Sequence, residues 1–258
     1  MDFEGKVVIL TGASSGIGEA CAYKFAKSGA LLSLVGRKVD NLNRVAEQCT
    51  KYCGNKPLVI SADISIAENI DKIAQSTVSH YGKIDVLVNN AGILIMGGIM
   101  DDIANLDKMI ATNLRGTYLL TQKCIPHLIE SKGNIVTISS VASTVVVPAM
   151  LPYSMTKAAL DIFTQCIAVE LGPKGVRVNS VNPGPVFSNL FINSGMSEEF
   201  YKEKFEEVKQ SVPLGKITDP EDVAELVTFL TSDRAKSISG SIHYIDGGLH
   251  LGVPPLKG

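Results

Sequence analysis

The class of fold is indicated by one stretch near the amino terminus, Lys6-Val-Val-Ile-Leu-Thr-Gly-Ala-Ser-Ser-Gly-Ile-Gly18. Its apolar start is typical of a buried strand, and Ile17, Cys21 and Phe25 then follow at the spacing of one helix face. The glycines in between let the backbone turn tightly, and unpaired N–H groups at a helix start attract a phosphate group. The spacing G-x-x-x-G-x-G is neither G-x-G-x-x-G nor a P-loop, so a purely structural turn is the alternative.

The alternation of apolar runs and amphipathic segments continues along the chain. We expect strands at Lys6–Leu10, Leu31–Val35, Pro57–Ile60, Asp85–Val88, Gly133–Ser140, Val176–Val181 and Ile242–Ile245. Helices are expected at Val39–Cys53, Ile66–His80, Ile103–Leu128 and from about Tyr153 to Leu171. Continuous apolar strands that alternate with helices indicate a parallel sheet covered on both faces. The prediction is an α/β protein, with one doubly wound domain over residues 1–258 and a seven-stranded parallel sheet.

The amino-acid composition gives no reason to expect nucleic acid, a membrane surface or a metal ion as a binding partner. Hydrophobic residues make up 45% of the 258 residues and charged residues 19%, which is typical of a globular protein. A formal net charge of -2 and the lack of a Lys/Arg run give no reason to expect nucleic acid or a membrane surface as partner. The 5 cysteines are scattered, and we expect no metal site. With no signal peptide and no long apolar span, a cytoplasmic location is expected.

One tyrosine stands out as a candidate acid-base group. Tyr153 and Lys157 are four residues apart, and on a helix such residues share a face, so the lysine charge is expected to lower the pKa of the phenol. Tyr23/Lys27 and Tyr52/Lys56 have the same spacing, but only Tyr153 follows a strand that ends in hydroxyls. Ser140, with Ser139 as a rival, closes that strand at the edge where parallel sheets bind ligands.

The residues after the second strand bear on the choice of cofactor. In dinucleotide-binding folds an acidic residue there binds the ribose of NAD, whereas an arginine accommodates the 2'-phosphate of NADP. This chain has Gly36 and Arg37 at that place, which favours NADP(H) over NAD(H). Asp40 is a nearby carboxylate, but we expect it to cap the next helix.

Taken in order, these markers resemble one family, the short-chain dehydrogenases/reductases, over nearly the whole chain. They are Thr11-Gly-x-x-x-Gly-x-Gly18, Asp63, Asn89-Asn-Ala-Gly92, Asn113, Ser140, Tyr153-x-x-x-Lys157 and Asn182-Pro-Gly184. Each has a plainer alternative, since Asn89, Asn90 and Asn182-Pro-Gly184 are also ordinary turn residues and Asp63 can cap a helix. The resemblance implies a Rossmann fold and, among family members, it points to carbonyl and 3-oxoacyl-carrier-protein reductases.

The family also implies roles for individual residues. Tyr153 would be the general acid-base, Ser140 would bind the substrate oxygen, Lys157 would lower the pKa of the tyrosine and bind the nicotinamide ribose, and Asn113 would support a water-mediated proton path. The implied cofactor-binding residues are Gly12, Ser15, Gly16, Ile17, Gly18, Arg37, Asp63, Ile64, Asn90, Ala91, Gly92, Tyr153, Lys157, Pro183, Gly184, Val186 and Ser188. The expected activity is an NADP(H)-dependent oxidoreductase of the EC 1.1.1 type that acts on ketones or secondary alcohols. Alternatives are an NAD-linked alcohol dehydrogenase of the same family and a dinucleotide-binding sensor or scaffold without turnover.

The segment from about 189 to 213 stands where this family has its substrate lid. It carries aromatic residues among charged ones, which suggests a fairly apolar small-molecule carbonyl or alcohol, although packing against the domain explains these aromatics equally well. The sequence does not choose among steroid, 3-oxoacyl, retinoid, sugar and xenobiotic carbonyls, nor between reduction and oxidation. The resemblance further implies a homotetramer, or a homodimer, built partly on the long helix and the Tyr153 helix.

Overall fold

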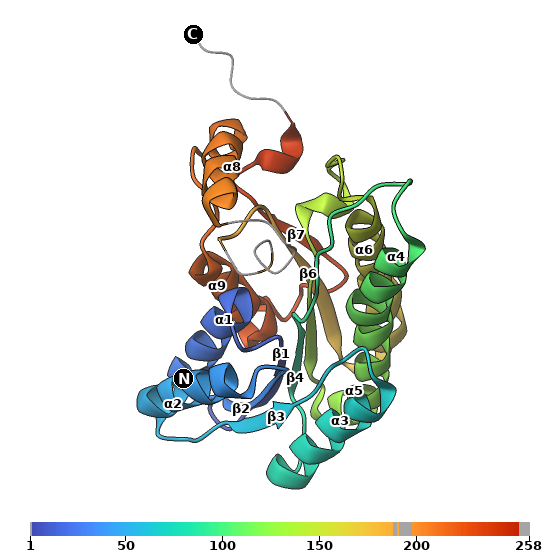
Figure 1. The fold of residues 1–258 in the computed structure, drawn as a ribbon. Coiled ribbons are helices and arrows are strands. Elements are labelled where there is room, and N and C mark those ends of the chain that lie inside the picture. The colour runs from blue at the N-terminus through green and yellow to red at the C-terminus, as the bar shows by residue number, and fades with distance from the viewer. Residues whose placement is uncertain (1, 188–189, 191–197, 253–258) are drawn as a thin grey trace.

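The computed structural model describes residues 2–187, 190 and 198–252. Within them one seven-stranded sheet, all of its pairs parallel, has the order β3-β2-β1-β4-β5-β6-β7 (Figure 1). The strands are β1 (Val7–Thr11), β2 (Leu31–Gly36), β3 (Leu58–Ser61), β4 (Val86–Asn89), β5 (Asn134–Ile138), β6 (Arg177–Pro183) and β7 (Ile242–Ile245). The predicted doubly wound fold with seven parallel strands is confirmed. Its strand order reverses between β1 and β4, and open sheets of this kind bind ligands at such a reversal.

Helices cover both faces of the sheet. The longer ones are α1 (Gly16–Lys27), α2 (Val39–Cys53), α3 (Ala67–Tyr81), α4 (Ile103–Met109), α5 (Thr117–Ser131), α6 (Leu151–Leu171), α8 (Glu198–Ser211) and α9 (Pro220–Thr231). The short helical segments are η1 (Ile110–Gly116), η2 (Val141–Ser143), η3 (Gly172–Lys174), η4 (Asp233–Ala235) and η5 (Leu249–Leu251). Helices α1, α2 and α9 lie on one side of the sheet, and α3, α5 and α6 lie on the other (Figure 1).

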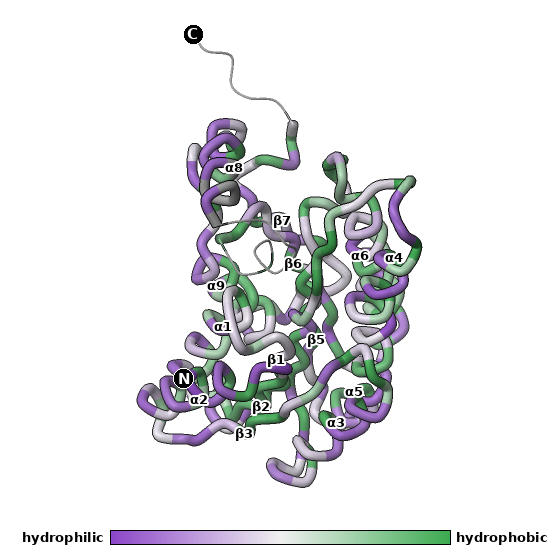
Figure 2. The backbone as a smooth tube through the Cα atoms, in the orientation of Figure 1, coloured by the Kyte–Doolittle hydropathy of each residue, from purple (hydrophilic) through white to green (hydrophobic). Residues whose placement is uncertain are grey.

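Two apolar cores form because successive side chains of a strand point to opposite faces. Val8 and Leu10 of β1 pack with Phe25 of α1 in one core, whereas Ile9, between them in sequence, packs with Ile73 of α3 in the other. The strands are therefore apolar on both faces, and polar residues collect on the outer helix surfaces (Figure 2). This explains why the strands appear in the sequence as continuous apolar runs.

A buried carboxylate fastens the amino-terminal ends of two central strands. Asp85 is 4% exposed and accepts a hydrogen bond from the Val7 N–H at 2.8 Å. Lys83 and Lys6 approach the same carboxylate at 2.9 and 3.6 Å. Beside it, a Cβ on Gly133 would lie 2.3 Å from the Asp85 carbonyl oxygen, so only glycine fits where α5 turns into β5.

The long helix predicted at Ile103–Leu128 forms with a change of geometry in its middle. It consists of α4, the π-helical segment η1 and α5, so that the ordinary i to i+4 pattern is interrupted before Thr117. Gly116 closes η1, and a Cβ there would lie 2.4 Å from the Ile64 carbonyl oxygen. The π-helical segment thus brings this helix into close contact with the loop after β3.

Strand β5 ends at Ile138, two residues before the predicted end at Ser140. Ser140 instead starts η2, where its Oγ accepts a hydrogen bond from the Ala142 N–H at 3.1 Å. A serine that bonds to the backbone two residues ahead favours a turn over a strand, which explains the earlier end.

The predicted lid at 189–213 is described from residue 198 onward and at Leu190. Its helix is α8, and Phe205 of α8 is buried against the ring of Phe187, with ring centroids 5.8 Å apart. Phe205 is the aromatic residue of this segment whose side chain the structure describes. Residues 188–189 and 191–197 lie outside the described part of the chain.

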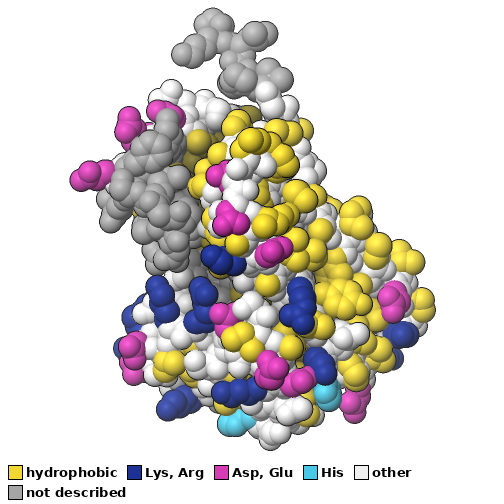
Figure 3. All heavy atoms as spheres, turned by 45° about the vertical axis from the view of Figure 1, so that its right-hand side comes forward, with side chains coloured by type: hydrophobic (Ala, Val, Ile, Leu, Met, Phe, Trp, Pro, Cys, Tyr) yellow, Lys and Arg dark blue, Asp and Glu magenta, His cyan; other side chains and the backbone are white. Residues whose placement is uncertain are grey.

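Exposed apolar side chains gather on the side of the molecule that carries α4, α5 and α6 (Figure 3). They include Ile103 of α4, Tyr118 of α5, and Ile162 and Val169 of α6. None of the described helices is long and apolar enough to span a bilayer.

We expect Asp85→Ala to lower the free energy of unfolding by about 1–3 kcal/mol, because the Val7 N–H loses its buried acceptor. Asp71→Ala is the matched control: its carboxylate pairs with Lys123 at 2.7 Å on the surface, and its loss should cost less than about 1 kcal/mol. Urea unfolding followed by circular dichroism measures both changes. Equal effects of the two substitutions would refute the anchoring role of Asp85.

Candidate active site

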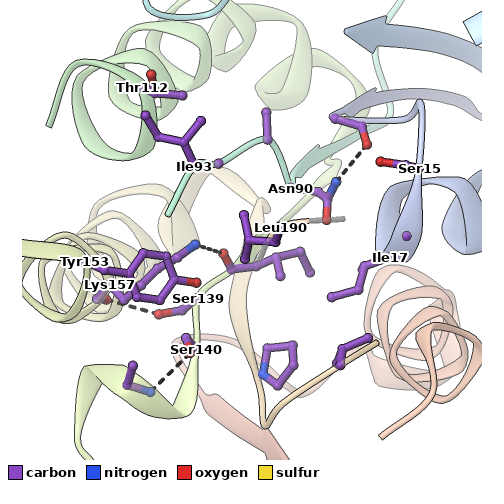
Figure 4. Close-up of a pocket in the computed structure, with 18 of the residues that line it drawn as sticks. Ser15, Ile17, Asn90, Ile93, Thr112, Ser139, Ser140, Tyr153, Lys157 and Leu190 are labelled. Carbon is purple, nitrogen blue, oxygen red and sulfur yellow. Dashed lines mark hydrogen bonds between the residues drawn. The ribbon is translucent and has the colours of Figure 1, made fainter. Parts of the chain in front are cut away.

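A cavity of about 520 Å³ opens at the edge of the sheet where the strands end (Figure 4). The turns after β1, β2, β3, β4, β5 and β6 all contribute lining residues, and so does α6. Residues far apart in the sequence meet there because parallel strands all end at one edge.

The glycine turn after β1 forms one end of the cavity. Gly12 and Gly16 have positive φ values of 66° and 55°, which favour glycine, and both line the cavity. Helix α1 begins at Gly16 with no capping bond from the Ser15 side chain, so its first N–H groups remain available for an anion. Ser15 and Ile17 also line the cavity.

Gly18 has a different role from the other glycines. It does not line the cavity, and a Cβ there would lie 2.2 Å from the Gly12 carbonyl oxygen. A Cβ on Gly12 would in turn lie 2.7 Å from Nδ2 of Asn90. Both residues are therefore glycine because the turn packs tightly against itself and against the loop after β4.

That loop is fixed by Thr11, at the end of β1. The Asn90 and Ala91 N–H groups each donate to Thr11 Oγ1 at 3.0 Å, and Asn90 Nδ2 donates to the Thr11 carbonyl at 2.8 Å. Asn90, Ala91 and Gly92, which were expected to bind the cofactor, line the cavity. The hydroxyl of Thr11 was not among the predicted site residues, although it belongs to the quoted motif.

Charged side chains gather at the end of the cavity next to β2 and β3. Arg37, Lys38, Asp63 and Ile64 line it, and Arg37 Nη1 lies 3.6 Å from Asp63 Oδ2. Burial raises the pKa of Asp63, but hydrogen bonds from Ser65 and the Arg37 charge outweigh it, so the net shift is downward. Asp40 does not cap α2 as expected, since the helix begins at Val39, and this exposed carboxylate lies in the first turn.

At the other end of the cavity, α6 carries Tyr153 and Lys157, both nearly fully buried. Lys157 Nζ donates to the Ile138 carbonyl at 2.8 Å and lies 5.5 Å from the centre of the Tyr153 ring. The Ser139 hydroxyl donates to the Lys157 carbonyl at 3.0 Å, so it is directed at the helix backbone (Figure 4). Ser140 is the serine whose hydroxyl interacts with Tyr153, which favours it over Ser139.

Asn113 lies directly behind this pair, on the π-helical segment η1. Its Oδ1 accepts from the Ile93 N–H at 2.8 Å, and its Nδ2 donates to the Ile93 carbonyl at 2.9 Å and to Thr156 Oγ1 at 3.2 Å. A Cβ on Gly92 would lie 3.3 Å from Asn113 Oδ1 and 3.7 Å from Lys157 Nζ. The structure thus brings Asn113, Ser140, Tyr153 and Lys157 together, although Asn113 itself does not line the cavity.

The expected lowering of the Tyr153 pKa is wrong for this structure. Burial raises the pKa of Tyr153 to about 12, and the hydrogen bond with Ser140 opposes this only in part. Burial also lowers the pKa of Lys157 to about 8, against the influence of Asp161. The cause is desolvation, which penalises the charged form of both groups, and the lysine charge is held by the Ile138 carbonyl and not by the phenol.

The remaining predicted residues divide into two groups. Pro183, Gly184 and Val186, after β6, line the cavity, whereas Ser188 lies outside the described residues. The other tyrosine-lysine pairs lie elsewhere: the Tyr23 hydroxyl donates to Glu19 at 2.7 Å, and Lys27 stacks over the Tyr52 ring. Lining residues that the sequence did not single out are mostly aliphatic, among them Ile93, Val145, Val147, Met150, Leu190, Val208 and Leu249.

The cavity fits a nicotinamide dinucleotide by its own features. An uncapped helix start and cavity-lining glycines suit a pyrophosphate, and Arg37 and Lys38 suit a further anionic group. Among the described residues, no group of three or more His, Cys, Asp or Glu side chains is placed to hold a metal ion.

Known proteins are similar to this chain in both sequence and fold. A family model described as Enoyl-(Acyl carrier protein) reductase matches residues 12–250. The 3-oxoacyl-[acyl-carrier-protein] reductase FabG of Thermotoga maritima is 35% identical over 255 residues, which cover 96% of this chain and 99% of that protein. A Caenorhabditis elegans short-chain dehydrogenase/reductase of unknown function, solved with cofactor, has a TM-score of 0.93 at 35% identity and 98% coverage of both chains.

A 3-ketoacyl-(acyl-carrier-protein) reductase from Brucella melitensis, solved in complex with NADH, has a TM-score of 0.86 at 34% identity, and the match covers 96% of this chain and 99% of that one. These similarities extend over nearly the whole chain. The chain belongs to the short-chain dehydrogenase/reductase family of oxidoreductases.

Proposed function

We propose that the protein is an NADP(H)-linked oxidoreductase that interconverts an apolar ketone and a secondary alcohol, with Tyr153 as the general acid-base. The observation that carries the proposal is the convergence of Tyr153, Ser140 and Lys157 at one end of a cavity whose other end is the uncapped start of α1. A protein that only binds a nucleotide has no need of a buried phenol in contact with a serine hydroxyl.

Hydride transfer to or from the substrate carbon is the chemistry that a bound nicotinamide supplies. The phenol of Tyr153, with its pKa raised to about 12, is protonated at neutral pH and so can donate its proton to a carbonyl oxygen. Ser140 offers a second hydrogen bond at the same oxygen, and the Lys157 ammonium offers N–H groups to ribose hydroxyls. Asn113 holds the loop at Ile93 and the helix at Thr156, and we assign it the support of a proton path to Lys157.

The phosphate turn and the charged end of the cavity are the proposed cofactor contacts. Gly12, Ser15, Gly16 and Ile17 would bind the pyrophosphate and ribose, with Gly18 supporting the turn from behind. Asp63 and Ile64 would contact the adenine, Asn90, Ala91 and Gly92 the adenosine side, and Pro183, Gly184, Val186 and Ser188 the carboxamide. Arg37 would accept the 2'-phosphate that distinguishes NADP from NAD.

An NAD-linked enzyme is the second candidate, and one contact favours it. Arg37 lies 3.6 Å from the Asp63 carboxylate, so part of its charge is already balanced. Against this, Lys38 adds a second positive charge at the same end and Gly36 carries no carboxylate that would repel a phosphate. The Brucella melitensis relative was solved with NADH. The relative affinities for NADPH and NADH therefore distinguish the two candidates.

The apolar surroundings of Tyr153 support an apolar substrate. Tyr153 packs in one cluster with Ala142 and Met150, and Val147 and Leu190 adjoin it. Among the described lining residues, the charged side chains are Lys157 and the three at the opposite end, Arg37, Lys38 and Asp63. A sugar would leave its hydroxyls without partners against these aliphatic side chains, at a cost in binding free energy.

The exposed apolar side chains on α4, α5 and α6 support a homo-oligomer, a homotetramer or a homodimer, with these helices in the interface (Figure 3). We also propose that residues 1–258 act as one domain with the segment around α8 as its lid. The described cysteines are unpaired, which accords with a cytoplasmic, reducing location.

We expect Tyr153→Phe to lower kcat by on the order of 100- to 10,000-fold, because the proton donor is lost while the ring still packs. An NADPH-oxidation assay over a panel of apolar ketones measures the change, and nucleotide fluorescence should show unchanged NADPH binding. Tyr23→Phe, which alters a half-buried tyrosine of the same Tyr-x-x-x-Lys spacing outside the cavity, is the control and should keep full activity. Turnover by Tyr153→Phe at the parent rate would sink the catalytic proposal.

We expect Arg37→Ala to weaken NADPH binding by roughly 10-fold or more and to leave NADH binding unchanged, since only NADPH carries the 2'-phosphate. Fluorescence titration of both nucleotides measures the two affinities. Arg44→Ala, which removes an arginine paired with Glu19 on α1, is the control and should change neither affinity. A parent protein that prefers NADH would decide for the second candidate.

We expect kcat/KM for alkyl and aryl ketones to exceed that for aldoses by roughly 100-fold or more. Val147→Asp should lower kcat/KM for the apolar ketones by roughly 10-fold or more, since a carboxylate replaces an aliphatic wall of the cavity. Val146→Asp is the matched control, because that neighbouring side chain is 93% exposed. Equal losses in both variants, or a preference for aldoses, would contradict the apolar substrate.

A further inference from the structure

A buried carboxylate that the proposed mechanism does not use lies on the same helix face as the tyrosine and the lysine. Asp161 follows Lys157 by four residues and Tyr153 by eight on α6, so the three side chains are stacked on successive turns. Asp161 is only 9% exposed. A buried charge is costly unless its surroundings compensate it, so its presence here calls for a partner.

The hydrogen-bond partners of Asp161 come from β6 and are neutral. Asn182 Nδ2 lies 3.1 and 2.9 Å from the two carboxylate oxygens, and Ser180 Oγ lies 3.3 Å from Oδ1. The amide orientation is fixed, since Asn182 Oδ1 accepts from Ser180 Oγ at 2.6 Å. These contacts orient the carboxylate but leave its negative charge in place, and the nearest positive group on this helix face is Lys157.

Lys157 carries a buried positive charge that the acceptor of its hydrogen bond does not neutralise. Its Nζ is buried and donates to the Ile138 carbonyl, a neutral acceptor that balances no charge. Burial lowers the pKa of Lys157 to about 8, and the Asp161 carboxylate acts in the opposite direction. Asn113, from η1, and Ser139, whose hydroxyl bonds to the Lys157 backbone carbonyl, do not titrate near neutral pH, and Tyr153 and Asp161 are the titratable groups on the same face of α6.

The same amide also reaches the loop that carries Ser140. Asn182 Nδ2 lies 3.2 Å from the Ser140 carbonyl oxygen and 3.0 Å from Ser143 Oγ. One side-chain amide therefore bridges the Asp161 carboxylate and the start of η2. Through this bridge the position of Ser140 relative to α6 depends on Asp161.

We propose that Asp161 is a positioning residue that keeps the Lys157 side chain in its ammonium form at neutral pH and, through Asn182, holds Ser140 beside Tyr153. The inference rests on the proposed function, in which Lys157 and Ser140 take part. It adds a residue and a charge requirement that the four residues of the proposed mechanism do not include.

The test is the titration of Lys157 in Asp161→Asn. We expect the pKa of Lys157 to fall by about one unit from that of the parent, because the carboxylate charge is removed while the side chain keeps its size. NMR of protein labelled with 13C at lysine Cε, with Lys157 identified by Lys157→Arg, measures this without cofactor or substrate. In a ketone-reduction assay the alkaline fall in kcat should move to lower pH by the same amount, with rates closest to the parent at about pH 6 or lower, where lysine is protonated in both proteins.

Matched variants separate charge from structure. Asp161→Glu keeps the charge and should keep the alkaline limb of the parent, and Asp161→Ser is a smaller neutral replacement should the asparagine variant not fold. Asp222→Asn removes one negative charge beside Lys216 on the surface and should leave Lys157 unchanged. An unmoved Lys157 pKa in the neutral variants, or a loss of kcat that is equal at every pH, would overturn the inference. Failure of the parent to reduce any ketone would sink the proposed function instead, since the NMR titration needs no turnover.

Discussion

The site depends on a reciprocal pair of hydrogen bonds between α6 and the end of β5. Lys157 Nζ donates to the Ile138 carbonyl at 2.8 Å, and the Ser139 hydroxyl donates back to the Lys157 carbonyl at 3.0 Å. Because the two bonds run in opposite directions, they fix both the position of α6 along its axis and its rotation about that axis relative to the sheet edge. Tyr153, one turn earlier, is consequently buried beside Ser140 at this end of the cavity and not exposed to solvent.

The sequence predicted the fold well because the relevant signals are local. The bounds of α2 and β7 match the predicted ones, and each of the other strands differs by one or two residues at one or both ends, where pairing with a neighbouring strand sets the limit. The meeting of Tyr153 with Ser140 was also accessible, since Ser140 follows a strand that ends at this edge, whereas Asn113 was expected only from the family resemblance. Family spacing then selected Ser140 over Ser139, and the hydrogen bonds give the physical reason, since the Ser139 hydroxyl is occupied by the helix backbone.

What the sequence did not reveal depends on burial and on contacts across the fold. The direction of the Tyr153 pKa shift was wrong because spacing reports the lysine charge but not the desolvation of both groups. The ion pair of Arg37 with Asp63 joins the ends of two strands, and the bridge from Asp161 to Ser140 needs Asn182 from a third. No periodicity in the chain signals such contacts. The change to π-helical geometry before Thr117 likewise has no pattern of its own in the sequence.

That change of geometry has a consequence for how the two ends of the cavity are joined. Gly116, at one end of η1, lies against the Ile64 carbonyl, and Asn113, on the same segment, grips the backbone of Ile93. The segment η1 thus contacts both the loop after β3 and the loop after β4, and its length sets the distance between them. Deleting a single residue from it would restore ordinary α-helical spacing and remove the wider turn that presents Gly116 to Ile64 and Asn113 to Ile93. The segment should therefore tolerate exchanges of exposed side chains far better than any change of its length.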